Sequence, residues 1–266
     1  MIKLFVTDID GTLLPAGGGV VPAKNIEAVQ AMTAAGVKVV IATGRMYSAA
    51  LPIANQFGVS VPIIAYNGAL IKSSAGEILH AQYMNAADVL DIIKFFEERG
   101  WHLQSYSDDV LYVPKHNELV NLYETMLKVK AVVVGWEGLR ERIKDVPKLL
   151  TISDTPDEAL RKLGELKKIF GGRVEITRSA AQFTEFMKLG VSKASAIKIL
   201  AEKFGVNNEE ILAIGDSEND LEMITSVGCG VAMGNAVDAV KSAAPHITDT
   251  CDNDGFAKAV YDYVLR

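Results

Sequence analysis

The sequence predicts an α/β protein in which a doubly wound parallel sheet is interrupted by an inserted α+β module. Three observations lead to this prediction. Short apolar runs alternate with helix-like segments over the first 84 residues, a pattern typical of strand–helix–strand units with right-handed crossovers. The same alternation returns after residue 188. Between the two stretches, strand-like runs flank turn residues, as they do in antiparallel hairpins.

The first 84 residues contain three predicted strands and two predicted helices. Apolar runs place the strands at Leu4–Val6, Val37–Ala42 and Pro62–Ala65. The second run is nearly continuous, which indicates burial on both faces. Helical periodicity places the helices at Ala23–Ala35 and Ser48–Phe57, each followed by a glycine. The glycine run at 17–19 is predicted to be a flexible turn, because no Gly-Lys-Ser/Thr sequence of a phosphate loop follows it.

Residues 85–188 form the predicted α+β module. Its helices are expected at Ala86–Arg99, Leu119–Leu127 and 156–170. The third has a clear start, with Thr155 as N-cap, proline at the first position and Glu158 three residues after the cap. Its strands are expected at Trp101–Tyr106, Val110–Val113, Ala131–Val134, Lys148–Ile152, Val174–Thr177 and Phe183–Met187.

The last segment returns to the α/β pattern. Ser192 is the predicted cap of a helix that ends at Gly205. Further strands are expected at Ile211–Ile214, Gly230–Ala232 and His246–Thr248, and a final helix at Phe256–Leu265. Residues 1–84 and 189–266 are therefore predicted to form one Rossmann-like core, into which residues 85–188 are inserted as a separate domain.

Composition excludes several classes of protein. The chain has 266 residues, 49% of them hydrophobic and 23% charged, with a net charge of −6. No basic stripe suited to a nucleic-acid backbone is visible, and no apolar run approaches the roughly 18 residues of a membrane span. Without a leader pattern, the sequence predicts a cytoplasmic protein. Cys229 and Cys251 form no metal-like pair and are predicted to be unpaired thiols.

Polar residues follow the predicted core strands at the edge where parallel sheets bind ligands. The first strand leads to Asp8 and Asp10, the second to the run Thr43-Gly44-Arg45, and the third to Asn67. The strand at Ile211–Ile214 leads to Asp216, Asn219 and Asp220. Lys193 lies in the first turn of the helix capped by Ser192, where the helix N-terminus favours anions.

These residue types suit a hard cation and a phosphate. Two unit charges about 4 Å apart repel by roughly 4 kcal/mol at an effective dielectric near 20. The pair Asp8 and Asp10 therefore needs a cation or a shared proton, although an Asp-Gly sequence alone is equally typical of a turn. A carboxylate can also act as a nucleophile toward phosphoryl groups. Magnesium prefers such oxygen ligands and keeps several waters.

The motifs resemble those of the haloacid dehalogenase superfamily, and more closely the Cof-type phosphatases with a type-2 (IIB) cap. The matching stretches are Asp8-Ile9-Asp10-Gly11-Thr12-Leu13, Ile41-Ala42-Thr43-Gly44-Arg45, Tyr66-Asn67-Gly68-Ala69, Gly190-Val191-Ser192-Lys193, Gly215-Asp216-Ser217-Glu218-Asn219-Asp220 and Gly230-Val231-Ala232-Met233-Gly234-Asn235-Ala236. They occur in the family's order over essentially the whole chain. One departure is Ala194, where a glycine often follows the lysine; a helix tolerates alanine better, so no functional loss is expected.

The resemblance implies a role for each matching residue. Asp8 would be the nucleophile, while Asp10 would protonate the leaving oxygen and then activate water. Mg²⁺ would be held by Asp8, the backbone carbonyl of Asp10, and Asp216. The phosphoryl oxygens would be bound by the backbone amide of Ile9 and by Thr43, Gly44, Lys193 and Asn219. Asp220 would orient Lys193 or the metal ligands, and Asn67 and Arg45 would line the pocket.

The expected function is a magnesium-dependent phosphatase of small phosphorylated metabolites, such as sugar phosphates, acting as a monomer or weak homo-oligomer. Three alternatives stay open: a phosphosugar mutase, a dehalogenase, which would need neither Asp10 nor a metal, and a non-catalytic regulator that binds a phosphorylated ligand. The cap is expected to select the substrate. Phe183, Glu185 and Met187 are candidates for facing the active site, but the sequence favours ordinary sheet positions for them.

Overall fold

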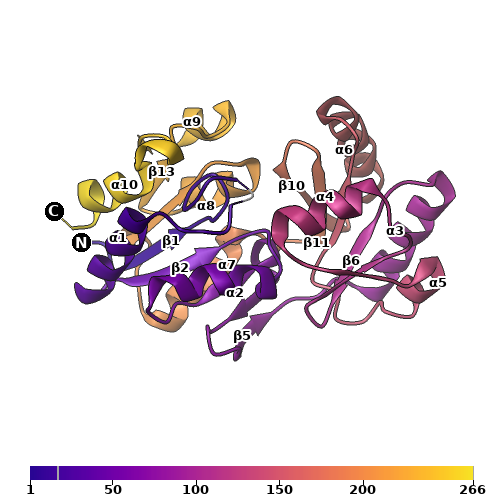
Figure 1. The fold of residues 1–266 in the computed structure, drawn as a ribbon, viewed down its shortest axis with the longest axis horizontal. Helices are drawn as coiled ribbons and strands as arrows, with labels where there is room; N and C mark the ends of the chain where they lie inside the picture. The colour runs from indigo at the N-terminus through magenta and orange to yellow at the C-terminus, as the bar shows by residue number, and fades with distance from the viewer. Residues whose placement is uncertain (17, 266) are drawn as a thin grey trace. The chain divides into compact units, whose positions relative to one another are not determined.

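The computed structural model describes residues 1–16 and 18–265, and these divide into two compact units (Figure 1). The core unit comprises Met1–His80 and Ser192–Arg266, and the inserted unit comprises Ala81–Val191. The predicted domain boundaries after residues 84 and 188 lie four and three residues from these divisions. Gly17, in the predicted glycine turn, lies outside the described residues.

The core unit is built on an eight-stranded sheet in the order β14-β13-β12-β1-β2-β3-β4-β5. The strands from β14 to β3 pair in parallel, which confirms the predicted parallel α/β fold. They are β1 (Leu4–Thr7), β2 (Lys38–Ala42), β3 (Ile63–Ala65), β12 (Ile211–Gly215), β13 (Cys229–Ala232) and β14 (His246–Ile247). Two short strands were not predicted: β4 (Leu70–Lys72), which pairs antiparallel with β3, and β5 (Ile78–Ala81).

Six α-helices lie in the described part of the core unit. They are α1 (Ala23–Ala34), α2 (Tyr47–Ala54), α7 (Lys193–Phe204), α8 (Leu221–Ser226), α9 (Asp238–Ala243) and α10 (Gly255–Tyr263). Phe5 of β1 packs edge-on against Phe256 of α10, with ring centroids 5.5 Å apart, so that helix covers the central strand. The sequence did not predict α8 and α9, because six residues are too few to show a helical period.

The inserted unit contains a six-stranded sheet in the order β10-β11-β9-β6-β7-β8. Its strands are β6 (Gln104–Ser107), β7 (Val110–Val113), β8 (Ala131–Val133), β9 (Leu149–Ile152), β10 (Val174–Ala180) and β11 (Phe183–Lys188). Neighbouring strands run antiparallel except for β7 and β8. Its helices are α3 (Ala86–Arg99), α4 (Glu118–Leu127), α5 (Gly135–Arg140), which was not predicted, and α6 (Pro156–Phe170).

An apolar core joins one face of this second sheet to α3, α5 and α6. Phe96 of α3 packs edge-on against Phe186 of β11, with ring centroids 5.8 Å apart. Leu149 of β9, Leu139 of α5 and Leu166 of α6 belong to the same buried cluster. Among the described residues, no helix is both long and apolar enough to cross a membrane.

Candidate active site

The turn after β1 positions two of the predicted site residues. The strand is fully buried and ends at Thr7. The chain then folds back at once, because the backbone carbonyl of Ile9 accepts hydrogen bonds from the amides of Leu13 and Leu14 at 2.9 and 3.1 Å. This tight turn leaves Asp8 only 6% exposed, whereas the Asp10 side chain is 31% exposed.

The same turn packs against Asp216 at the end of β12. Gly11 has a φ of +79°, and a Cβ at this position would lie 2.5 Å from Oδ2 of Asp216, so only glycine fits here. Thr12 donates a hydrogen bond from its hydroxyl to Oδ1 of Asp216 at 2.7 Å. No role for Thr12 was predicted, although both partners lie in motifs that the sequence analysis singled out.

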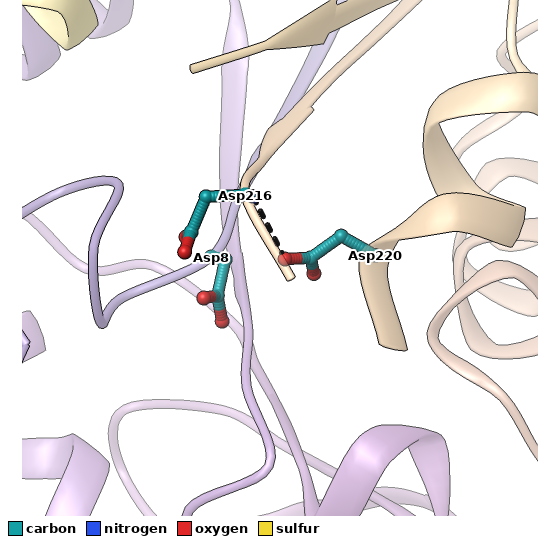
Figure 2. Close-up of side chains that lie close together, drawn as sticks. All are labelled: Asp8, Asp216 and Asp220. Atoms are coloured by element: carbon teal, nitrogen blue, oxygen red, sulfur yellow. Dashed lines mark hydrogen bonds between the residues drawn. The ribbon is translucent and has the colours of Figure 1, made fainter. Parts of the chain in front are cut away.

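Asp8, Asp216 and Asp220 form a carboxylate cluster in which one oxygen of each lies within 4.8 Å of the others (Figure 2). Asp220 accepts hydrogen bonds on Oδ2 from the backbone N–H groups of Asp216 and Ser217, both at 3.0 Å. Its Oδ1 accepts from Nζ of Lys193 at 2.6 Å. Both oxygens of Asp220 are therefore engaged within the protein. The predicted metal set contained the Asp10 carbonyl and left Asp220 outside it.

Lys193 is the cation nearest to this cluster. The Ser192 side chain caps α7 by accepting from the backbone N–H of Ser195, which fixes Lys193 at the first helical position. Its Nζ donates to Oδ1 of Asp8 at 2.7 Å as well as to Asp220, and the residue is 1% exposed. Burial lowers the pKa of the Lys193 ammonium, but Asp220 and Asp8 outweigh burial and raise it. The lysine is therefore charged.

Negative charge exceeds positive charge in this cluster. Burial raises the pKa of the Asp8 carboxyl well above its usual range, and Asp220 and Asp216 raise it further against the opposing effect of Lys193. Burial and Asp220 also raise the pKa of Asp216 to about 7. Three carboxylates share one ammonium, so the donor set suits a divalent cation bound by hard oxygen ligands. Asp8 and Asp216 are the side chains that would hold it.

Asp10 is paired with Arg45. The guanidinium donates from Nε to Oδ2 at 2.7 Å and from Nη2 to Oδ1 at 2.6 Å, a two-pronged ion pair typical of an ionised carboxylate. The Arg45 backbone N–H also bonds to the hydroxyl of Thr43 at 3.1 Å. The sequence allowed an ion-pair role for Arg45 but did not indicate Asp10 as its partner. A carboxylate held in this way accepts hydrogen bonds and donates none, so a proton-donating Asp10 must first separate from Arg45.

The ends of β2 and β3 bring the other predicted residues to the same edge. Thr43 follows β2 and is 1% exposed, with Gly44 next to it. After β3, Asn67 has a φ of +55°, and its Oδ1 accepts a hydrogen bond from Nδ2 of Asn219 at 2.9 Å. A Cβ on Gly68 would lie 2.2 Å from the Ser192 carbonyl oxygen, so this turn lies directly against the start of α7. Asn219 was predicted to bind phosphate, but in this structure its side-chain amide donates to Asn67.

We expect the raised pKa of Asp216 to make the metal-free protein more stable as the pH falls. Between its ordinary value of 3.8 and about 7, the folded protein binds a proton that the unfolded chain does not. Stability therefore decreases as the pH rises through this window and levels off above it. With a chelator present, we compare the melting temperature of the protein with that of Asp216→Asn. The difference should increase in favour of the unmodified protein as the pH is lowered from 8 to 5.

The Asp216→Asn reference is needed because His102 titrates in the opposite sense. Burial, followed by Lys162 and Lys115, lowers its pKa from 6.5 to about 4, so its contribution to stability is lost as the pH falls. Saturating Mg²⁺ should make the melting-temperature difference between the protein and Asp216→Asn depend less on pH, since a bound cation keeps the carboxylate ionised. A relative melting temperature that falls from pH 8 to pH 5 would contradict the assignment.

We expect Lys193→Met to destabilise the protein strongly at neutral pH. Removal of the ammonium leaves Asp8 and Asp220 buried without their common partner, a change that costs about 3 kcal/mol of unfolding free energy or more. Urea unfolding measures the loss. Lys198→Met is a matched control, because Lys198 lies exposed on the same helix and should change stability by less than about 0.5 kcal/mol. Equal losses in the two variants would contradict the prediction.

A family model described as haloacid dehalogenase-like hydrolase matches residues 5–260. The chain belongs to the haloacid dehalogenase-like hydrolase family. A 5-amino-6-(5-phospho-D-ribitylamino)uracil phosphatase of Bacillus subtilis is 35% identical over 267 residues, covering 99% of this chain and 96% of the relative. An HMP-PP phosphatase of Serratia proteamaculans is 30% identical, covering 93% and 89%. A solved sugar phosphatase of subclass IIB has a TM-score of 0.86 at 28% identity, covering 99% and 100%.

These matches confirm the resemblance inferred from the motifs. The chain is therefore a hydrolase of the phosphatase type. It matches the family model, and it aligns with phosphatase relatives over nearly the full length of both chains. Family members generally use a divalent metal, and the carboxylate cluster of this chain is a place where one can bind.

Proposed function

We propose that the protein is a Mg²⁺-dependent phosphatase that hydrolyses small phosphorylated metabolites, above all sugar and polyol phosphates, through an aspartyl-phosphate on Asp8. The observation that carries this proposal is the placement of Asp8. Its buried carboxylate lies 2.7 Å from Nζ of Lys193 and within 4.8 Å of a carboxylate oxygen of Asp216. The proposed nucleophile, Asp8, therefore lies next to both a positive charge and the proposed cation site. This combination serves attack on a dianionic phosphoryl group.

The first half of the reaction uses both aspartates of the first motif. A carboxylate oxygen of Asp8 attacks phosphorus, the bond from phosphorus to the leaving oxygen breaks, and Asp10 gives that oxygen a proton. In the second half, Asp10 takes a proton from water, the water oxygen attacks phosphorus, and the bond to Asp8 breaks. Phosphate is released and both side chains return to their starting states. Asp10 serves as acid and then as base, a role that contributes about 10²-fold or more.

Other residues bind the phosphoryl group. Lys193 neutralises charge that spreads over the phosphoryl oxygens in the transition state, and Asp220 holds the lysine in place at 2.6 Å. The remaining binding groups in this proposal are the amide of Ile9, Thr43, Gly44 and Asn219. Bound Mg²⁺, held by Asp8, Asp216 and the Asp10 carbonyl, would add further neutralisation of phosphoryl charge. Arg45 and Asn67 complete the pocket, and Arg45 must release Asp10 during the cycle.

The proposed substrate class rests on the relatives. Several are named for phosphorylated compounds of small size, including one with a ribityl chain and one sugar phosphatase. We propose that the inserted unit is the cap that selects among such substrates. A cytoplasmic location and a monomeric or weakly associated state stay predictions.

The test is phosphate release from a panel of phosphorylated metabolites, assayed with Mg²⁺ and with a chelator. We expect release that depends on Mg²⁺ and is concentrated on sugar or polyol phosphates. An isomeric phosphorylated product without free phosphate would indicate a mutase. Tight binding of a panel compound without any turnover would indicate a regulatory protein. Either of these results would overturn the proposal.

A further inference from the structure

The motif at residues 230–236 has no part in the reaction described above. It contains most of β13 and the turn that follows, and its one amide side chain is that of Asn235. Nδ2 of Asn235 donates to the backbone carbonyl of Gly11 at 2.8 Å, and Oδ1 accepts from the backbone N–H of Cys251 at 2.7 Å. The motif therefore contacts the turn that carries Asp8 and Asp10.

The two partners of Asn235 fix the orientation of its amide. A backbone carbonyl only accepts hydrogen bonds, and a backbone N–H only donates them. If the amide were turned over, its oxygen would face the Gly11 carbonyl and its nitrogen would face the N–H of Cys251, so both bonds would be lost. Asn235 is exposed. Its bonds therefore orient the turn, and the residue fills no part of the core.

Backbone hydrogen bonds join the same motif to the end of β12. Met233 and Val237, two residues to either side of Asn235, donate from their N–H groups to the carbonyls of Gly215 and Asp216 at 3.0 and 2.9 Å. The chain around Asn235 is thus attached to the segment that carries Asp216. Asn235 therefore links that segment to the turn after β1.

Thr12 makes a second link between the same two segments. Its hydroxyl donates to Oδ1 of Asp216 at 2.7 Å, and the residue is fully buried. The other carboxylate oxygen of Asp216 accepts from the hydroxyl of Ser217 at 3.1 Å, a bond between neighbours in the chain. The bond from Thr12 therefore sets the direction of the Asp216 carboxylate relative to the turn.

The two links span the proposed cation site. The proposed ligands are Asp8 and the Asp10 carbonyl on the turn, and Asp216 on the other segment. Gly11, whose carbonyl bonds to Asn235, follows Asp10 directly, so this bond restrains the peptide next to the Asp10 carbonyl. Groups that bond to metal ligands orient them, and their loss commonly weakens metal binding by about 10- to 100-fold.

We propose that Thr12 and Asn235 are positioning residues that hold the turn and Asp216 at the separation that Mg²⁺ requires, and that they thereby favour Mg²⁺ over Ca²⁺. This inference rests on the proposed function, which assigns the cation ligands. Mg²⁺ demands nearly ideal octahedral geometry with oxygens at about 2.0–2.1 Å, whereas Ca²⁺ accepts flexible geometry at about 2.3–2.6 Å. Loss of a link should therefore weaken Mg²⁺ binding more than Ca²⁺ binding.

The test measures the apparent dissociation constants of Mg²⁺ and Ca²⁺ without substrate, from the melting temperature as a function of cation concentration. Thr12→Val keeps the shape of the side chain and removes its hydroxyl. It should reduce the ratio of Mg²⁺ to Ca²⁺ affinity by about tenfold. Thr12→Ser keeps the hydroxyl and removes a buried methyl group. It should lower the melting temperature and keep the affinity ratio within about twofold of wild type.

Asn25 supplies a matched control for Asn235. Its Nδ2 donates to the backbone carbonyl of Leu13 at 2.8 Å, which is the same type of bond to the same turn, but it comes from α1. Asn235→Ala should reduce the affinity ratio by about fivefold, with little change in the melting temperature of the cation-free protein. Asn25→Ala alters a buried residue, so it should lower the melting temperature more and keep the ratio within about twofold.

Several results would overturn the inference. They are a wild-type melting temperature that does not respond to Mg²⁺, an unchanged ratio in Thr12→Val or Asn235→Ala, and an equal change of the ratio in Thr12→Ser or Asn25→Ala. Because Asn235 is exposed, Asn235→Ala decides the matter if Thr12→Val does not fold.

The proposed function is tested separately by phosphate release from p-nitrophenyl phosphate. A wild-type protein that binds Mg²⁺ and releases no phosphate would refute the phosphatase activity, while the affinity ratios would still support the two positioning residues. A Mg²⁺-dependent phosphatase whose affinity ratio is the same in all four variants would refute the positioning residues and support the activity.

Discussion

Asp8→Asn should abolish phosphatase activity and leave the protein folded. An amide cannot attack phosphorus as a carboxylate does, so we expect kcat to fall by about 10⁴-fold or more. The fold should tolerate the change, because burial already disfavours the charged form of Asp8 by raising its pKa. Lys193 keeps its second partner, Asp220, at 2.6 Å. Steady-state phosphate release and thermal unfolding measure the two effects.

The stability measurement separates this account from a structural role for Asp8. Without metal, the melting temperature of Asp8→Asn should equal or exceed that of the wild type, as is common when a site optimised for chemistry is neutralised. An inactive variant that is also unfolded would leave the nucleophile unidentified, and Asp8→Ser would then be the second variant to examine. More than about 1% residual activity in a folded variant would contradict the nucleophile assignment.

Asp10→Asn should slow turnover by about 10²- to 10⁴-fold, because it removes the group that moves protons in both halves of the reaction. The two halves should respond differently to the leaving group. With p-nitrophenyl phosphate, whose leaving oxygen hardly needs a proton, attack by Asp8 should still occur. The hydrolysis of the aspartyl-phosphate should be slow, so the variant should release a burst of about one nitrophenolate per enzyme and then nearly stop.

A matched change at the partner residue sharpens this prediction. Arg45→Gln removes the ion pair with Asp10 and leaves the carboxylate in place. It should therefore retain steady turnover where Asp10→Asn shows a burst, with a smaller loss of kcat. A burst in Arg45→Gln, or its absence in Asp10→Asn together with near-normal turnover, would show that Asp10 does not activate water.

Local sequence patterns predicted the centre of the fold well. The core strands β1, β2 and β12 are short, apolar and buried on both faces, so their runs stand out against the polar turns that follow. Strands β4 and β5 carry no such signal, because β4 ends in Lys72 after only two apolar residues and no residue of β5 is fully buried. The position of β12 beside β1 depends on long-range pairing, to which no local pattern points.

The candidate site was partly predictable for the same reason. Parallel strands bring their carboxyl ends to one edge, so residues after β1, β2, β3 and β12 were expected to lie together. Pairings between side chains were not predictable. Arg45 bonds to Asp10 across 35 residues of sequence, and Asp220 enters the carboxylate cluster because its Oδ2 accepts from the turn at Asp216 and Ser217. Such contacts depend on side-chain geometry, which motifs leave open.

The most direct test of the central claim is to trap the phosphorylated enzyme. Asp10→Asn would be mixed with p-nitrophenyl phosphate and Mg²⁺, quenched in acid, digested and analysed by mass spectrometry. The account predicts one phosphoryl group per chain, carried by the peptide that contains Asp8, and none when Mg²⁺ is replaced by a chelator. Phosphate found on another residue, or nitrophenolate released without any covalent phosphoenzyme, would contradict it.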